Sequence, residues 1–119
     1  MSYQRLKQLD IETFISYQTD KITTLKLNNN RLKSLSAHSL LNFTSLDELN
    51  LNHNRLEFLE EGCFKSLLNL KTLLLAGNHL VQLNTGSFYG LINLQVLNLA
   101  DNEIKFADSS SLPFISNFY

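Results

Sequence analysis

The chain has 119 residues, enough for one domain, and its balance of 44% hydrophobic to 18% charged residues predicts a folded protein rather than a disordered one. A formal net charge of −1 gives no overall attraction to nucleic acid or to an anionic membrane surface. The single cysteine, Cys63, excludes an internal disulfide and a cysteine metal cluster, and no apolar run is long enough to form a membrane span.

Residues 1–21 form the first segment, and its apolar positions Leu6, Leu9, Phe14 and Tyr17 match the second half of the repeat unit that follows. We therefore expect a partial preceding repeat or an N-terminal cap. The opening residues lack the apolar core of a signal peptide.

From Ile22 onward the sequence repeats every 24 residues without a gap, in the pattern apolar-x-x-L-x-L-x-x-N-x-apolar, and such a period predicts stacked repeats. The units are 22–45, 46–69, 70–93 and 94–117, with residues 118–119 starting a truncated fifth. The patterned apolar residues are Ile22, Leu25, Leu27, Leu32, Leu46, Leu49, Leu51, Leu56, Leu70, Leu73, Leu75, Leu80, Leu94, Leu97, Leu99 and Ile104. The return half of each unit adds the apolar columns Leu40, Phe64, Phe88, Leu112 and Phe43, Leu67, Leu91, Ile115.

The L-x-L segment of each unit predicts a short strand, because alternation places both leucines on one face. Stacking these strands in parallel gives a sheet with a leucine core on one side and solvent on the other. Helical content should be low, and the return half should pack a second apolar spine led by Phe64 and Phe88.

An asparagine follows each predicted strand where the chain must turn sharply and leave backbone polar groups beside the core. A side-chain amide can donate and accept there, so we expect a hydrogen-bonded ladder between adjacent turns. The predicted structural asparagine ladder comprises Asn30, Asn54, Asn78 and Asn102.

These columns resemble the leucine-rich repeat, and the 24-residue unit with phenylalanine in its return half is similar to the extracellular subtype found in Toll-like receptors, small proteoglycans, neuronal adhesion proteins and variable lymphocyte receptors. The resemblance covers residues 22–117. It implies an α/β fold, a right-handed horseshoe solenoid with a concave parallel β-sheet and a mostly irregular convex side. Because the cysteine-rich caps usual in that subtype are missing, we expect a fragment, with possible end-to-end contact through uncapped repeats.

Solvent-facing strand residues are the least needed for the fold and are therefore free to bind a ligand. The third and fourth units place Leu74, Val96 and small residues there beside polar ones, as in a protein-binding surface with an apolar centre and a polar rim. Leu74 is the strongest single candidate, and for Ala76 and Gly77 the alternative is that small residues permit a tight turn. The candidate ligand-binding residues of the concave face are Lys26, Asn28, Glu48, Asn50, Asn52, His53, Thr72, Leu74, Ala76, Val96, Asn98 and Asp101.

Other motifs carry less. Asn42-Phe43-Thr44 fits the N-glycosylation pattern on the convex side, against the alternative of an unused triplet. Cys63 lies in a column of serines and is interpreted as a quiet thiol rather than a nucleophile. The histidines show no metal-ligand spacing and no Ser/His/Asp or Cys/His arrangement occurs, so no catalytic residue, metal or cofactor is predicted.

The sequence therefore predicts a non-catalytic module that recognises a protein ligand through its concave face, in a secreted or cell-surface receptor or adhesion protein. The alternative is a cytosolic scaffold or regulatory subunit with the same fold, whose lone thiol stays reduced. Nucleic acid is not an expected partner, because the face has few bases beyond Lys26, Arg31 and Arg55 and no aromatic residue for base stacking.

Overall fold

The structure is a computed structural model that describes residues 18–84 and 86–107. The interpretation of the first segment as a preceding repeat or cap falls mainly on residues outside these ranges. The same is true of the apolar positions Leu112 and Ile115 and of the start of a fifth repeat.

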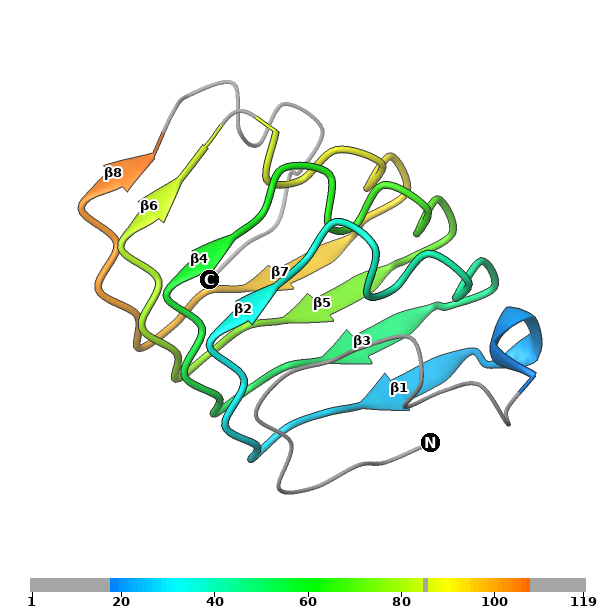
Figure 1. The fold of residues 1–119 in the computed structure, drawn as a ribbon, viewed down its shortest axis with the longest axis horizontal. Helices are drawn as coiled ribbons and strands as arrows, with labels where there is room; N and C mark the ends of the chain where they lie inside the picture. The colour runs from blue at the N-terminus through cyan, green and yellow to red at the C-terminus, as the bar shows by residue number, and fades with distance from the viewer. Residues whose placement is uncertain (1–17, 85, 108–119) are drawn as a thin grey trace.

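The main sheet has four parallel strands, one from each repeat unit. They are β1 (Thr24–Lys26), β3 (Glu48–Asn50), β5 (Thr72–Leu74) and β7 (Val96–Asn98). The strands lie side by side in the order β1-β3-β5-β7, and each residue pairs with its equivalent in the next unit (Figure 1). The predicted parallel stack is confirmed.

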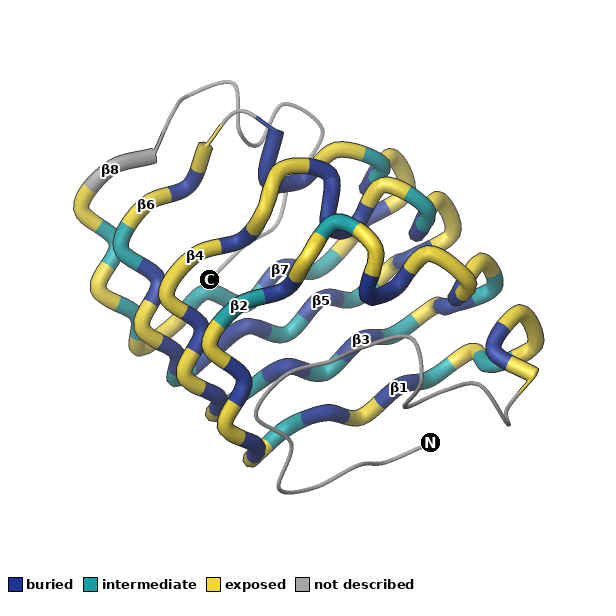
Figure 2. Tube along the Cα trace, viewed as in Figure 1, coloured by how far each residue is buried: buried dark blue, intermediate teal, exposed yellow. Residues whose placement is uncertain are grey.

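The central leucine of each strand is buried, whereas its two neighbours in the strand are half-buried or exposed. Leu25, Leu49, Leu73 and Leu97 all have 0% exposure, because the alternation of a strand turns them into the space between the walls of the solenoid. Figure 2 shows buried residues alternating with less buried ones along these strands and recurring at intervals along the return segments. Full burial of one such side chain stabilises the fold by about 1.5–3 kcal/mol.

The opposite wall carries strands of only two residues, which were not predicted. They are β2 (Ser34–Leu35), β4 (Phe58–Leu59), β6 (Gln82–Leu83) and β8 (Phe106–Ala107). β2 pairs with β4 and β6 pairs with β8, both in parallel, so this wall is divided into two short sheets while the main sheet is continuous. The main sheet is thus the continuously paired wall of the solenoid, as expected for its concave side.

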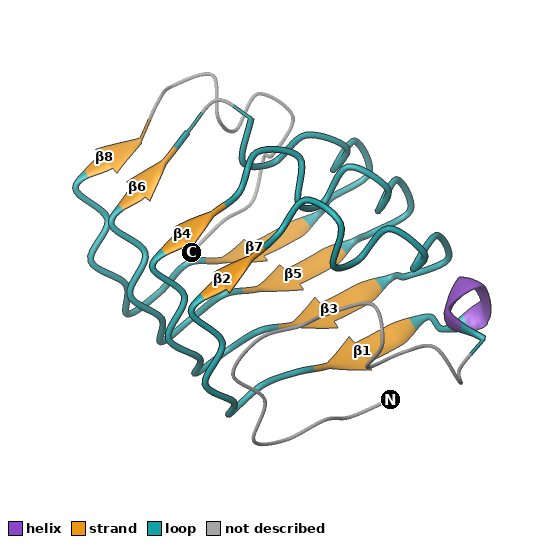
Figure 3. Cartoon of the chain, viewed as in Figure 1, coloured by secondary structure: helices purple, strands orange, loops and turns teal. Residues whose placement is uncertain are grey.

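The connections between the walls are loops and turns, and the helix described in residues 18–84 and 86–107 is a single 3-10 turn at Thr19–Lys21 (Figure 3). In the same ranges, no helix is long and apolar enough to cross a membrane. Phe64 and Phe88 form the predicted second spine, with their rings stacked at a centroid distance of 6.2 Å and an interplanar angle of 19°. Both are buried, so the return segments close the core from the convex side.

Candidate functional site

The asparagine at the end of each main strand has a structural role. Asn54 Nδ2 donates to the carbonyl oxygens of Leu27 at 2.9 Å and Leu51 at 3.0 Å, and its Oδ1 accepts from the Leu32 backbone N–H at 3.2 Å. Asn78 repeats these bonds one layer on. Because both ends of the Asn54 amide are used inside the core, this ladder is not available to a ligand.

The outward residues of the main sheet form rows that run across the strands. The first row is Thr24, Glu48, Thr72 and Val96, and all four are half-buried. The central row is Lys26, Asn50, Leu74 and Asn98, in which Lys26 is exposed and the other three are half-buried. The third row is Asn28, Asn52, Ala76 and Ala100, and the turn row is Asn29, His53, Gly77 and Asp101. These rows hold all the predicted binding residues on one face, and their contact with a ligand stays a prediction.

Ala76 is buried, unlike the other predicted binding residues of this face, and its role as a binding residue stays a prediction. Its exposure is 8%. Both backbone groups are engaged, the N–H with Asn52 Oδ1 at 2.7 Å and the carbonyl oxygen with the His53 N–H at 2.8 Å. A single methyl group is too short to rise above these neighbours, whereas Asn28 and Asn52 in the same row remain half-buried.

The turn row is determined by backbone conformation. Asn29, His53 and Asp101 have φ values of 60°, 58° and 55°, and Gly77 has a φ of 67°. Glycine adopts this left-handed region freely, and asparagine, aspartate and histidine tolerate it better than other residues. The composition of the row is thus explained without a ligand, and for Gly77 the tight-turn alternative is the correct one. The side chains of His53 and Asp101 are exposed.

Asn50 and Asn98 of the central row and Asn52 of the third row cap backbone N–H groups, a role that sequence reasoning missed. Asn50 Oδ1 accepts from the Asn52 N–H at 3.0 Å, and Asn98 Oδ1 accepts from the Ala100 N–H at 3.0 Å. In the layer between them the equivalent residue is Leu74, which has no acceptor, and the Ala76 N–H is instead bonded by Asn52 of the preceding layer. In the sequence, the only sign of these caps is that Asn50 and Asn98 each lie two residues before the N–H group that they bind.

A further asparagine column borders the sheet where its strands begin. Asn69 Nδ2 donates to the Thr44 carbonyl oxygen at 3.1 Å, and Asn93 Nδ2 donates to the Leu68 carbonyl oxygen at 2.7 Å. These residues line a shallow groove of about 260 Å³ together with Ser45, Asp47, Lys71 and Gln95. The bonds of Asn69 and Asn93 tie successive return segments together.

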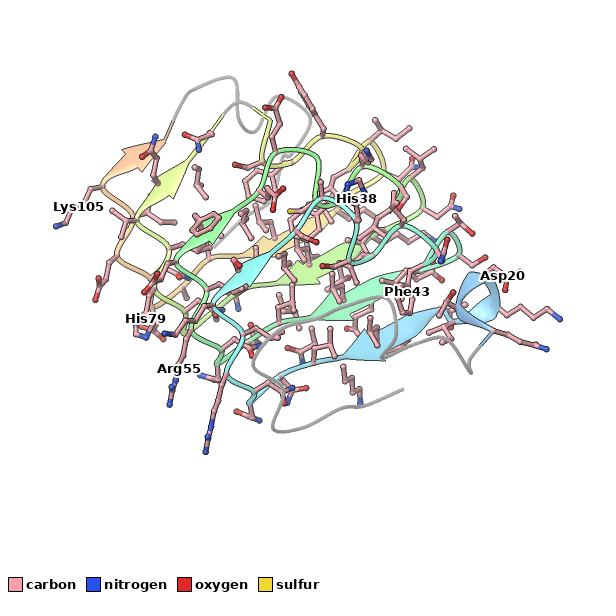
Figure 4. All side chains as sticks on the ribbon, in the orientation of Figure 1. Asp20, His38, Phe43, Arg55, His79 and Lys105 are labelled. Atoms are coloured by element: carbon pink, nitrogen blue, oxygen red, sulfur yellow. The ribbon has the colours of Figure 1, made fainter. Side chains whose placement is uncertain are left out.

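The remaining candidates are placed as follows. Asn42 is exposed on the convex turn. Cys63 is buried, and this burial, assisted by the negative charge of Glu60, raises the pKa of its thiol to about 12. Arg55 and His79 project into solvent from successive layers beyond the ends of the main strands (Figure 4). Within residues 18–84 and 86–107, no group of three His, Cys, Asp or Glu side chains gathers as a metal site requires.

Repeated layers of strand, asparagine turn and return segment define a solenoid repeat protein whose outer sheet face is left uncovered by its own described residues. The profile of the family described as leucine rich repeat matches residues 2–56, 20–80 and 68–113, so this chain belongs to the leucine-rich-repeat family. Such domains are generally non-catalytic. No curated protein matches the chain by sequence.

Solved structures show the same solenoid. A chain of the Toll–Spatzle complex from Drosophila is 30% identical over 83% of this chain and 14% of that chain, with a TM-score of 0.79. Its glycosylated form gives 31% identity, 85% and 14% coverage and the same TM-score of 0.79. A chain of the Drosophila melanogaster SNF/U2A' complex is 28% identical over 87% of this chain and 58% of that chain, with a TM-score of 0.71. The chain thus spans 14% and 58% of the lengths of these neighbours.

Proposed function

We propose that this chain is a non-catalytic module that binds a protein ligand across the outer face of its main sheet. The observation that carries the proposal is the central row. Leu74 is half-buried between Asn50 and Asn98 in register, and its side chain is on the face turned away from the leucine core. A leucine held there has no packing role inside the solenoid, and an apolar centre with a polar rim is typical of protein interfaces.

Photo-crosslinking tests this proposal. A photoreactive phenylalanine analogue replaces Thr72, an outward residue of β5, or Gln82, an exposed residue of β6 on the opposite wall. We expect a specific protein adduct at position 72 that excess wild-type chain suppresses and that Leu74→Gln, a charge-neutral variant of similar size, suppresses at least tenfold less well. Adducts only at position 82, or equal competition by both chains, would move the binding surface elsewhere.

For location, we propose a secreted or cell-surface receptor or adhesion protein. The similarity to a chain of the Toll–Spatzle complex supports this, as does the exposed Asn42 in an acceptor triplet. The second candidate is an intracellular scaffold or regulatory subunit, which the similarity to a chain of the SNF/U2A' complex favours.

Glycosylation separates the two locations. The full chain is expressed in eukaryotic cells behind a secretory leader, with Asn42→Gln as the control. An extracellular protein should gain one glycan that shifts its mass, that peptide N-glycosidase removes and that the control lacks. Secretion of folded but unmodified chain, together with binding partners found only in the cytosol, would favour the intracellular alternative.

A further inference from the structure

The central row presents hydrogen-bond donors toward solvent. The oxygens of the Asn50 and Asn98 amides are turned to the backbone N–H groups of Asn52 and Ala100, at 3.0 Å each. Backbone N–H groups can only donate, so this contact fixes which end of each amide faces them. The Nδ2 groups of Asn50 and Asn98 therefore face away from the backbone, and the residues described in the structure give them no acceptor.

The same row carries one positive charge and one apolar side chain. Lys26 pairs in register with Asn50, Asn50 with Leu74, and Leu74 with Asn98. An ammonium group has donors only. The row thus reads cation, donor, apolar group, donor across four neighbouring strands.

The acidic residues of this face lie outside the central row. Glu48 stands in the first row, at the start of β3, and Asp101 stands in the turn row beyond the end of β7. The other members of the first row, Thr24, Thr72 and Val96, are uncharged. The central row has neither a carboxylate nor a free amide oxygen to bind a cationic ligand.

We propose that the central row recognises a protein segment in which an aliphatic side chain is flanked by oxygen acceptors, with a carboxylate toward Lys26. This inference rests on the proposed function and adds the chemistry of the partner. Strands are spaced about 4.8 Å apart, so the row spans about 14 Å, which four or five extended residues would cover. The aliphatic side chain packs on Leu74 while the acceptors bind the amides of Asn50 and Asn98.

Selection from a random library identifies the preferred chemistry. A phage-displayed library of random peptides of about twelve residues is panned on the immobilised wild-type chain, with soluble Leu74→Gln chain in excess to remove peptides that bind elsewhere. We expect the enriched peptides to combine Asp or Glu with a neighbouring Leu, Ile or Val. One such peptide is then synthesised and its affinity for each variant is measured.

Aspartate variants separate donor loss from misfolding. Asn50→Asp and Asn98→Asp each keep an oxygen that accepts the same backbone N–H, but exchange the outward donor for a negatively charged acceptor. Each should weaken the selected peptide at least tenfold, and Lys26→Glu should do the same. Asn84→Asp is the matched control, because exposed Asn84 accepts from Gln82 Nε2 on the opposite wall and the exchange adds the same charge. It should leave affinity within twofold.

A direct readout covers variants that fold poorly. In the ¹⁵N-labelled wild-type chain, the side-chain NH₂ resonances of Asn50 and Asn98 should shift on adding the peptide, while that of Asn84 should not. Two results would overturn the donor inference and leave the proposed binding face intact. In the first, the peptides that fail to bind the Leu74→Gln chain are basic. In the second, they bind both aspartate variants as well as they bind wild type. If no peptide depends on Leu74, the proposed function fails as well.

Discussion

Two sets of asparagines, one inside the solenoid and one on its outer face, show how the same side chain serves different purposes. Asn54 is buried and uses its Nδ2 and its Oδ1 on backbone groups of two layers. Asn50 is half-buried, and among the residues that the structure describes only its oxygen has a partner. Whether an asparagine can bind a ligand therefore depends on which of its amide groups is still free, and the residue type alone does not decide this. The sequence columns separated the two sets, but they did not show which end of the Asn50 amide is bonded.

The largest effect should separate Asn54→Asp from Asn50→Asp. The first change removes one of the two side-chain donors to each of the Leu27 and Leu51 carbonyl oxygens and sets a buried carboxylate against them, so we expect a loss of about 4 kcal/mol in the free energy of unfolding. The second keeps its cap on the Asn52 N–H and should cost under about 1 kcal/mol. Urea denaturation followed by circular dichroism measures both.

Equal costs for these two variants would contradict the distinction between the two sets. Complete loss of a cooperative transition in Asn54→Asp counts as the large effect, provided that Asn50→Asp still unfolds cooperatively near the wild-type midpoint.

A smaller effect concerns the compensation around Leu74. Asn52→Ala leaves the N–H of buried Ala76 without its acceptor and should cost about 1–2 kcal/mol. Leu74→Asn supplies an oxygen from the same layer, as Asn50 and Asn98 do for their own N–H groups. A double-mutant cycle should therefore show that Asn52→Ala costs at least about 0.5 kcal/mol less in the Leu74→Asn background. Strict additivity would show that the two caps are unrelated.

The turn row should respond to backbone conformation. At Gly77, with a φ of 67°, an added methyl would collide with the His53 ring, so Gly77→Ala should destabilise by about 1–2 kcal/mol. Asn29→Gly, at a φ of 60°, should be neutral or stabilising by a few tenths of a kcal/mol. Thermal and urea unfolding of both variants test this, and a stable Gly77→Ala with an unstable Asn29→Gly would reverse the argument.

The repeating columns predicted most of the fold. The leucine spacing located the main strands and their parallel order, because buried positions recur with the period of the layers. The recurring asparagine located the ladder for the same reason. The two-residue strands β4 and β6 escaped prediction, because segments that short contain no alternation to read.

The candidate face was predicted as a surface but not in detail. The burial of Ala76 depends on the bonds that Asn52 and His53 make to it across layers, and a column of letters does not contain these distances. The left-handed backbone of the turn row could have been predicted from the sequence, because its residue types tolerate that conformation. They are Asn29, His53, Gly77 and Asp101. The amide caps needed coordinates, because an asparagine can turn either end toward solvent.

At neutral pH, the smallest effect on stability should come from Cys63→Ser, because the fold does not require a cysteine at this buried position. Cys63 is buried in a column where Ser39 and Ser87 are buried too. Ser87 Oγ accepts from the Asn84 N–H at 3.0 Å, and Glu60 holds the place of Asn84 one unit earlier. The hydroxyl of Cys63→Ser can therefore take an equivalent bond, and we expect a change within about 0.5 kcal/mol at pH 7.

At alkaline pH, Cys63→Ser should differ measurably from wild type in its free energy of unfolding. Burial raises the pKa of the Cys63 thiol from 9.0 to about 12 in the folded chain, so the folded state keeps a proton that the unfolded state releases. The stability from this neutral thiol is complete below pH 9.0 and is lost as the pH rises from 9.0 toward 12. Wild type should lose stability relative to Cys63→Ser across that range, and paired urea midpoints at neutral and alkaline pH measure the difference. If the urea midpoints of wild type and Cys63→Ser fall in parallel with pH, the thiol is solvated, and this inner column is as accessible to water as the outer face.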